Sequence, residues 1–159
     1  MIRRACAGGI AAYLSLALSG CSSAPPAGRI HWERLPQLQT ETTVFFDRGH
    51  ASRTEGGYRV YLYSDRGAPS RVGSSSAVFR TLSLDVPRGP KPAHPPALVY
   101  EMRSARLRRV YRSISTSQSS LSQTDGRVSG SLKAKLSENL YGTDYEGGDV
   151  DLTFDVPIE

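Results

Sequence analysis

The chain has 159 residues, a formal net charge of +5 and two cysteines. A length near 150 residues predicts a single domain, which buries enough apolar surface to fold without cross-links. So mild a positive charge does not indicate a nucleic-acid-binding protein, and no nucleic-acid partner is expected.

The first twenty residues have the composition of a targeting segment. Arg3 and Arg4 carry positive charge, and a largely apolar stretch from Ala5 to Leu18 follows. This stretch is short for a membrane-spanning helix, which needs roughly 20 apolar residues. A charged start, a short apolar middle and small residues at the end are typical of a secretion signal peptide. Residues 1–20 are therefore expected to be removed.

The segment Leu18-Ser19-Gly20-Cys21 closes this region. It resembles the lipobox of bacterial lipoproteins, in which a leucine and two small residues precede a cysteine, and the resemblance covers about residues 1–23. It implies cleavage before Cys21, attachment of diacylglycerol to its thiol and acylation, for example with palmitate, of the new amine. Each buried methylene contributes about 0.8 kcal/mol, so two or three acyl chains make a lasting membrane anchor. The alternatives are an ordinary signal peptide or an uncleaved N-terminal anchor.

Residues 21–40 are predicted to be the lipidated N-terminus and a flexible tether. The stretch 22–28 is small, polar and proline-containing, with little to bury. In proteobacterial lipoproteins a serine such as Ser22 after the cysteine favours the outer membrane. The expected location is the cell envelope, with the domain in the periplasm or at the cell surface. Trp32 is expected to fix the point at which the tether meets the domain.

Residues 41–159 are predicted to form a single β-rich domain. Four segments rich in β-branched and aromatic residues indicate strands at 42–46, 57–63, 77–86 and 97–103. The segment Pro87–Pro96 is too rich in proline for a central strand and is expected to be an extended connection. Between residues 104 and 122 an amphipathic helix and a long strand both fit, and the serine-rich part favours the strand.

The last two predicted strands have the clearest alternation of apolar and polar residues, at 128–136 and 149–156. Such alternation is typical of an antiparallel sheet with one wet face. A register in which paired residue numbers sum to 284 places Lys135 opposite Asp149 and Lys133 opposite Asp151. The same register places Gly130 opposite Phe154 inside the domain. About seven strands and no confident helix predict an all-β antiparallel sandwich or small barrel.

The sequence shows no catalytic constellation, and neither a metal nor another cofactor is expected. The three histidines lie in the tether (His31), in a predicted turn (His50) and in the proline segment (His94). No nucleophile motif accompanies them. The single cysteine of the mature chain is acylated, so a Cys/His zinc site is excluded. The domain is therefore predicted not to be an enzyme.

Two charged clusters allow a functional and a structural interpretation. Acidic residues surround Gly147-Gly148 and could hold calcium, but their spacing does not match an EF-hand loop. Arginines gather between residues 103 and 112 and could meet lipid headgroups or acidic glycans. Solvated strand faces are the favoured interpretation of both. The clusters comprise Asp144, Glu146, Asp149 and Asp151, and Arg103, Arg106, Arg108, Arg109 and Arg112.

Tyr61 and Tyr63 share one face of their predicted strand with Arg59. Outward tyrosines can form a flat platform for a sugar or peptide, although packing against the neighbouring strand is favoured. The function predicted from sequence is a membrane-anchored envelope lipoprotein whose β-domain is a non-catalytic binding or structural module. An envelope protein or a glycan is its expected partner. The alternatives are a secreted hydrolase or transferase with a site built from scattered residues, and a carbohydrate-binding module.

Overall fold

The computed structural model describes residues 25–36, 41–64, 78–87, 94–104, 107–140 and 143–159. The predicted signal peptide, the lipobox and Cys21 lie outside these residues. So does Arg106, together with most of the predicted proline-rich connection. In the described part of the chain, no helix is long and apolar enough to cross a membrane.

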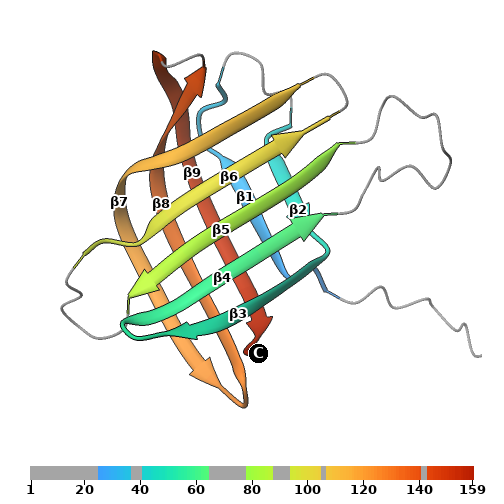
Figure 1. Cartoon of the computed structure of the whole chain (residues 1–159), viewed down its shortest axis with the longest axis vertical. Coiled ribbons are helices and arrows are strands. Elements are labelled where there is room, and N and C mark those ends of the chain that lie inside the picture. Colours follow the sequence, from blue (N-terminus) through green and yellow to red (C-terminus); the bar gives the residue numbers. More distant parts are fainter. Residues whose placement is uncertain (1–24, 37–40, 65–77, 88–93, 105–106, 141–142) are drawn as a thin grey trace, which may run out of the picture.

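All regular structure in the described residues is β-strand, which confirms the predicted all-β class. Nine antiparallel strands form one sheet in the order β2-β1-β9-β8-β7-β6-β5-β4-β3. The sheet curls into a nearly closed barrel, in which β3 to β6 cross in front of β1, β2 and β9 (Figure 1). The strands are β1 Gly28–Trp32, β2 Thr43–Phe46, β3 Arg48–Thr54, β4 Gly57–Ser64, β5 Phe79–Pro87, β6 Ala97–Arg103, β7 Arg108–Thr124, β8 Arg127–Leu140 and β9 Thr143–Pro157.

The barrel follows the order of the chain around its circumference. Strands β3 to β9 form an uninterrupted antiparallel meander, and β9 then pairs with β1, which pairs with β2. The two edge strands, β2 and β3, are joined through the single residue Asp47. They therefore act as one bent strand that passes from one edge of the sheet to the other. An opening remains along the outer edge of β2, where no hydrogen-bonded ladder closes the wall, and we call this opening the seam.

Two of the nine strands were not expected from the sequence. Gly28–Trp32 forms β1 in the middle of the sheet, so the prediction that the tether extends to residue 40 is wrong. His31 accordingly lies in a strand, and Trp32 is a core residue that is 2% exposed. His50 lies in β3 rather than in a turn. The strand count is therefore nine instead of about seven.

The region for which both a helix and a strand were predicted, residues 104–122, belongs to a long strand from Arg108 onward. β7 runs from Arg108 to Thr124 and pairs with β8 from Tyr111 to its end, so the helical alternative is wrong. Two register irregularities interrupt the pairing, between Ser113 and Ser115 and between Thr116 and Gln118. Such irregularities bend a strand, and β7 curves strongly around one side of the barrel (Figure 1).

The predicted pairing of the last two strands is confirmed. Lys133 lies opposite Asp151, and the Lys133 Nζ is 3.2 Å from the Asp151 carboxylate. Gly130 lies opposite the buried Phe154, and a Cβ added at Gly130 would come within 2.7 Å of its ring. The glycine therefore makes room for the phenyl group. The predicted connection 137–148 instead continues the ladder as far as Leu140 and Thr143.

Alternating side chains of all strands fill the barrel interior. At the end where β4 begins and β5 ends, the inward side chains carry no charge and are largely apolar, as Tyr58, Val60 and Val86 illustrate. We call this the apolar end. At the other end, at the upper right of Figure 1, β4 ends and β5 begins, and the inward side chains include charged groups. We call this the polar end.

Candidate functional site

Inward-facing polar residues gather at the polar end because the strands alternate in direction. Ser64 ends β4, Arg80 begins β5, Arg109 begins β7 and Glu138 lies near the end of β8. Ser64 pairs with Arg80, Arg80 with Met102, and Met102 with Arg109, so these residues form one row across four strands. Burial alternates along each strand, so the row faces inward. One mouth of the barrel is therefore polar inside.

Arg109 and Glu138 form a buried ion pair within this mouth. The side chains are each 3% exposed, and both carboxylate oxygens accept hydrogen bonds from the guanidinium. This finding corrects the prediction that the arginines near residue 109 share a solvated face. A buried charge needs a partner with good geometry, and the two-bond pairing supplies it. Arg108, which points outward, pairs instead with Glu101 on β6.

An aromatic cluster packs beside this ion pair. The Trp32 ring lies 5.3 Å from that of Tyr100 and 6.5 Å from that of Tyr111, both in edge-to-face geometry. The Arg109 guanidinium carbon lies 5.6 Å from the centre of the Tyr111 ring. Burial is the main reason that the pKa of both tyrosine hydroxyls is raised, and the negative charge of Glu138 adds to the effect at Tyr111. The pKa of Tyr111 rises to about 12. Both hydroxyl groups therefore keep their protons at neutral and mildly alkaline pH.

Several buried polar atoms at this end have no hydrogen-bond partner within the described part of the chain: Trp32 Nε1, Arg80 Nε, Tyr100 OH, Arg109 Nη1 and Tyr111 OH. All five can donate a hydrogen bond. Each has almost no accessible surface, so the interior is closed over them. Among the described residues, the polar end therefore has more buried hydrogen-bond donors without an acceptor than the apolar end.

A pocket of about 410 Å³ opens at the seam, next to the polar end. Three consecutive residues of β2 line it, Thr43 to Phe45. Successive side chains of a strand point to opposite faces, so a pocket that touches three in a row borders the edge of the strand. The opposite wall comes from the end of β4 and the start of β5, with Ser64, Val78 and Arg80.

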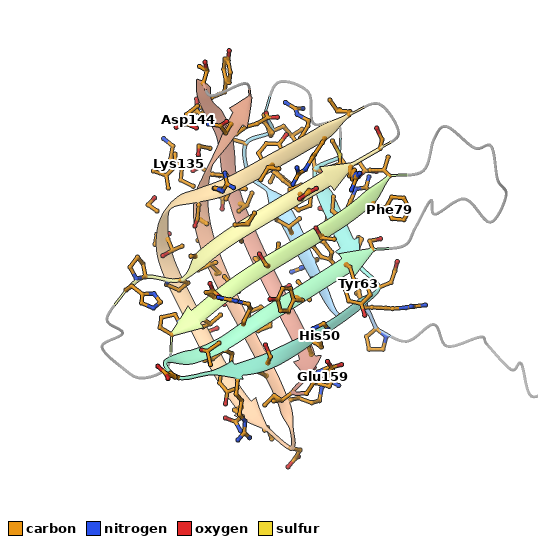
Figure 2. The ribbon with its side chains drawn as sticks, in the orientation of Figure 1. His50, Tyr63, Phe79, Lys135, Asp144 and Glu159 are labelled. Carbon is orange, nitrogen blue, oxygen red and sulfur yellow. The ribbon has the colours of Figure 1, made fainter. Side chains whose placement is uncertain are left out.

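An ion pair crosses the seam beside this pocket. The Arg80 Nη2 donates to the Glu41 Oε2 at 2.5 Å, and the Arg80 side chain is only 15% exposed. The Ser64 hydroxyl donates to the Asp47 carboxylate at 3.2 Å. Phe45 lines the pocket and is 41% exposed, and Phe79, which lies between the lining residues Val78 and Arg80 in the chain, is 45% exposed. Figure 2 shows Phe79 at the start of β5, at the polar end of the barrel. The seam therefore combines a polar floor with an apolar rim.

The two edges of the sheet are protected very differently. β3 carries Arg48 and Arg53, and its outer edge forms a parallel bridge from Ala51 to Ile158. The Glu159 N–H donates to the Ala51 carbonyl at 2.9 Å, which covers this edge further. β2 has the sequence Thr-Val-Phe-Phe, without charge or proline, and no described strand pairs with its outer edge. Charges and covering segments are the usual protection of an edge strand; the residues of β2 itself carry no charge, and within the described residues no strand covers its outer side.

The histidines predicted to be scattered remain apart. His31 Nδ1 lies 2.8 Å from the Thr43 hydroxyl on the outer surface, as a polar pair between β1 and β2. Asp151 lies opposite His31 on β9, but its carboxylate faces Lys133. His94 Nδ1 lies 3.1 Å from the carbonyl of Pro95. The arrangement of His31 and Thr43 is that of a cross-strand contact on the wet face.

The acidic cluster near Gly147-Gly148 is divided among different partners. Asn139 donates to Asp144 at 2.8 Å, and Arg34 donates to Glu146 at 3.0 Å. Lys133 pairs with Asp151. In the described residues no group of three or more metal-binding side chains comes together. Figure 2 labels Lys135 and Asp144 on the same side of the barrel.

Tyr61 and Tyr63 point outward, as the alternation of β4 predicted, while Tyr58, Val60 and Leu62 are buried. His50 of β3 joins them, with its ring 5.2 Å from that of Tyr61 and 6.4 Å from that of Tyr63 (Figure 2). Arg59 pairs with Asp85 on the same face, and this hydrogen bond is the main reason that the pKa of Arg59 is raised. The result is a small aromatic patch on the outer wall.

Sequence reasoning missed the residues of the seam. Glu41 and Arg80 are 39 positions apart, and only the closure of the barrel brings them together. The signal that could have found the edge is the uncharged run Thr43–Phe46, which contrasts with the arginines of β3. Comparison with protein-family models, curated proteins and solved structures finds no match to this chain.

Proposed function

We propose that the chain is a lipid-anchored lipoprotein of the bacterial cell envelope, and that its barrel is a non-catalytic binding module. The anchor is inferred from the ordered signal segment and the lipobox ending in Cys21. Two or three acyl chains there would hold the protein at a membrane. The barrel would then stand in the periplasm or at the cell surface.

A single observation carries the binding role: the pocket of about 410 Å³ borders the unpaired outer edge of β2. Its volume is within the range of about 300–1,000 Å³ that is usual for ligand sites. Exposed apolar residues surrounded by polar groups are a common mark of a binding surface. Phe45 and Phe79 supply the former, and Glu41 and Arg80 supply the latter.

Photo-crosslinking in intact bacteria tests this role. A photoreactive amino acid placed at position 45, at the pocket, should give a covalent adduct with the natural ligand. The matched control places it at position 114, because Ile114 is also exposed but lies on the outer face of β7, away from the pocket. An adduct at position 45 alone supports the proposal. No adduct, or equal adducts at both positions, contradicts it.

The anchor is tested separately by mass spectrometry of the mature N-terminus. Acylated Cys21 is the expected first residue, and replacing Cys21 with Ser should release the protein from the membrane or leave an unprocessed precursor. A free thiol at position 21, or cleavage at another site, would contradict the anchor.

A second candidate function is carbohydrate binding, which the outer aromatic patch favours. The His50 ring on β3 lies 5.2 Å from the Tyr61 ring and 6.4 Å from the Tyr63 ring on β4. Flat aromatic rings stack against sugar rings. A glycan array should then give a signal that Tyr63→Ala abolishes and that Phe45→Ala leaves unchanged. A signal that depends on Phe45 instead assigns the glycan to the seam.

A further inference from the structure

We infer that the seam binds an extended polypeptide segment of a partner protein, which pairs with the outer edge of β2 and is apolar on its inner side and acidic on its outer side. This inference rests on the proposed binding function and names the class of ligand. It concerns an added strand rather than a small molecule in the pocket.

The hydrogen-bonding pattern of β2 supports strand addition. The Trp32 N–H donates to the Thr42 carbonyl at 2.8 Å, and paired residue numbers of β1 and β2 sum to 74. Because bonded and non-bonded pairs alternate in an antiparallel ladder, Val44 and Phe46 direct their backbone groups to β1. Thr43 and Phe45 direct theirs to the seam. The edge thus presents two N–H and two C=O groups with the spacing of a strand.

The side chains beside this edge define the inner side of the incoming segment. Val44 and Val78 line the pocket, and Arg80 reaches across its floor to Glu41. Successive residues of an added strand would point alternately into the pocket and out to solvent. Apolar residues at the inward positions fit Val44 and Val78.

Two exposed arginines lie one strand away from the seam, on β1 and on β6. Arg29 lies opposite Phe45 in the β1–β2 ladder, and Arg103 lies opposite Phe79 in the β5–β6 ladder. All four residues are exposed. Phe45 and Phe79 therefore each have an exposed arginine as a cross-strand neighbour. An acidic residue at an outward position of the segment would have one of these arginines one strand further out on either side, which favours binding through charge complementarity.

The same features argue against a second copy of the chain as the occupant. The pocket joins β2 to residues of β4 and β5, so it admits a narrow extended segment more readily than the edge of another barrel. A second copy would also present the uncharged β2 of its own chain, Thr43–Phe46, which carries no acidic residue to complement Arg29 and Arg103. A partner segment with acidic outward residues supplies that charge.

The test uses the full-length lipidated protein in detergent micelles and a phage-displayed library of random linear peptides. Enriched peptides should alternate apolar and acidic residues. Thr43→Pro removes an N–H that faces the seam and spares the ladder to β1, so it should weaken their binding by at least about tenfold. The matched control is Arg53→Pro on β3, whose N–H also faces away from its paired strand. It should leave peptide affinity unchanged.

Charge reversal provides a second variant that does not depend on the backbone. Arg103→Glu should weaken binding of the acidic peptides severalfold at low salt, while Arg53→Glu should not. Binding that is equal in wild type, Thr43→Pro and Arg103→Glu would overturn the inference, as would failure to enrich any peptide. Dimerisation that Thr43→Pro abolishes would identify a second copy as the occupant and overturn it too. If peptides fail while crosslinking at position 45 captures a small molecule, the binding function stands and the strand-addition mode falls.

Discussion

The two ends of the barrel differ in the side chains that fill the interior. At the apolar end, inward side chains interlock, and the fit of Phe154 over Gly130 leaves no room even for a methyl group. At the polar end, ion pairs occupy the interior, several donors lack acceptors, and the wall opens along β2. The apolar end is therefore closed by packing, whereas the polar end is closed by ion pairs and has an incomplete wall. The polar end keeps an unpaired edge and a pocket, as expected for the part of a domain that binds a partner.

A large effect is expected at the apolar end. Phe154→Ala should lower the free energy of unfolding by about 3–5 kcal/mol, because it leaves a cavity in a filled core. Thr153→Ala, at the neighbouring outward position, is the control and should change it by less than about 0.5 kcal/mol. Urea denaturation of both variants measures the difference. Equal effects would show that the apolar end is not packed as described.

At the polar end the ion pair gives the next prediction. Glu138→Ala leaves the buried Arg109 without a partner and should cost about 3–5 kcal/mol. Replacing both residues, as Arg109→Met with Glu138→Leu, should restore most of that stability, because two buried charges disappear together. A double variant no more stable than Glu138→Ala would contradict this account of the pair. The same denaturation experiment gives the answer.

The sequence predicted the apolar end better than the polar end for a physical reason. Strict alternation in β8 and β9 determined the register, and Lys133 with Asp151 gave it a charge pattern. These signals lie within two neighbouring segments. A one-residue slip would have buried the charges, so few alternatives were open.

The polar end depends on contacts between distant segments, which no local pattern reveals. β1 is five residues long and follows a proline-containing stretch, and β3 contains glycine, histidine and two arginines. Their strand structure comes from pairing with β9 and β4. Arg109 and Glu138 are 29 residues apart in the sequence. A charged residue considered alone is predicted to lie on the surface, and only the folded barrel buries these two as a pair. The pocket likewise arises only from closure of the barrel.

A smaller effect distinguishes partnered from unpartnered hydroxyls. Tyr58 donates a hydrogen bond to Gln123, whereas the buried hydroxyl of Tyr100 lies near Arg80 but makes no hydrogen bond of normal geometry in the described chain. Tyr58→Phe should therefore lower the free energy of unfolding by about 1 kcal/mol. Tyr100→Phe should leave it unchanged or raise it by up to about 1 kcal/mol. A clear loss of stability in Tyr100→Phe would indicate a partner for that hydroxyl.

Alkaline pH should weaken the polar end specifically. The folded state raises the pKa of Tyr111 to about 12. An unfolded tyrosine loses its proton near pH 10. The stability linked to this proton is complete below about pH 10 and falls as the pH rises towards 12. Tyr111 alone accounts for a loss of about 1 kcal/mol at pH 11. Melting temperatures at pH 9 and pH 11 should therefore differ less for Tyr111→Phe than for wild type, and an equal difference would contradict the shift.

Amide hydrogen exchange along β2 tests the open seam most directly. The account predicts an alternating pattern in the free protein, with slow exchange at Val44 and Phe46, whose N–H groups face β1, and fast exchange at Thr43 and Phe45. On the covered edge, the neighbouring strand β3 serves as the reference within the same sample. Slow exchange at all four residues of β2 would mean that another segment already covers this edge, and would contradict the claim that the seam is open to a partner.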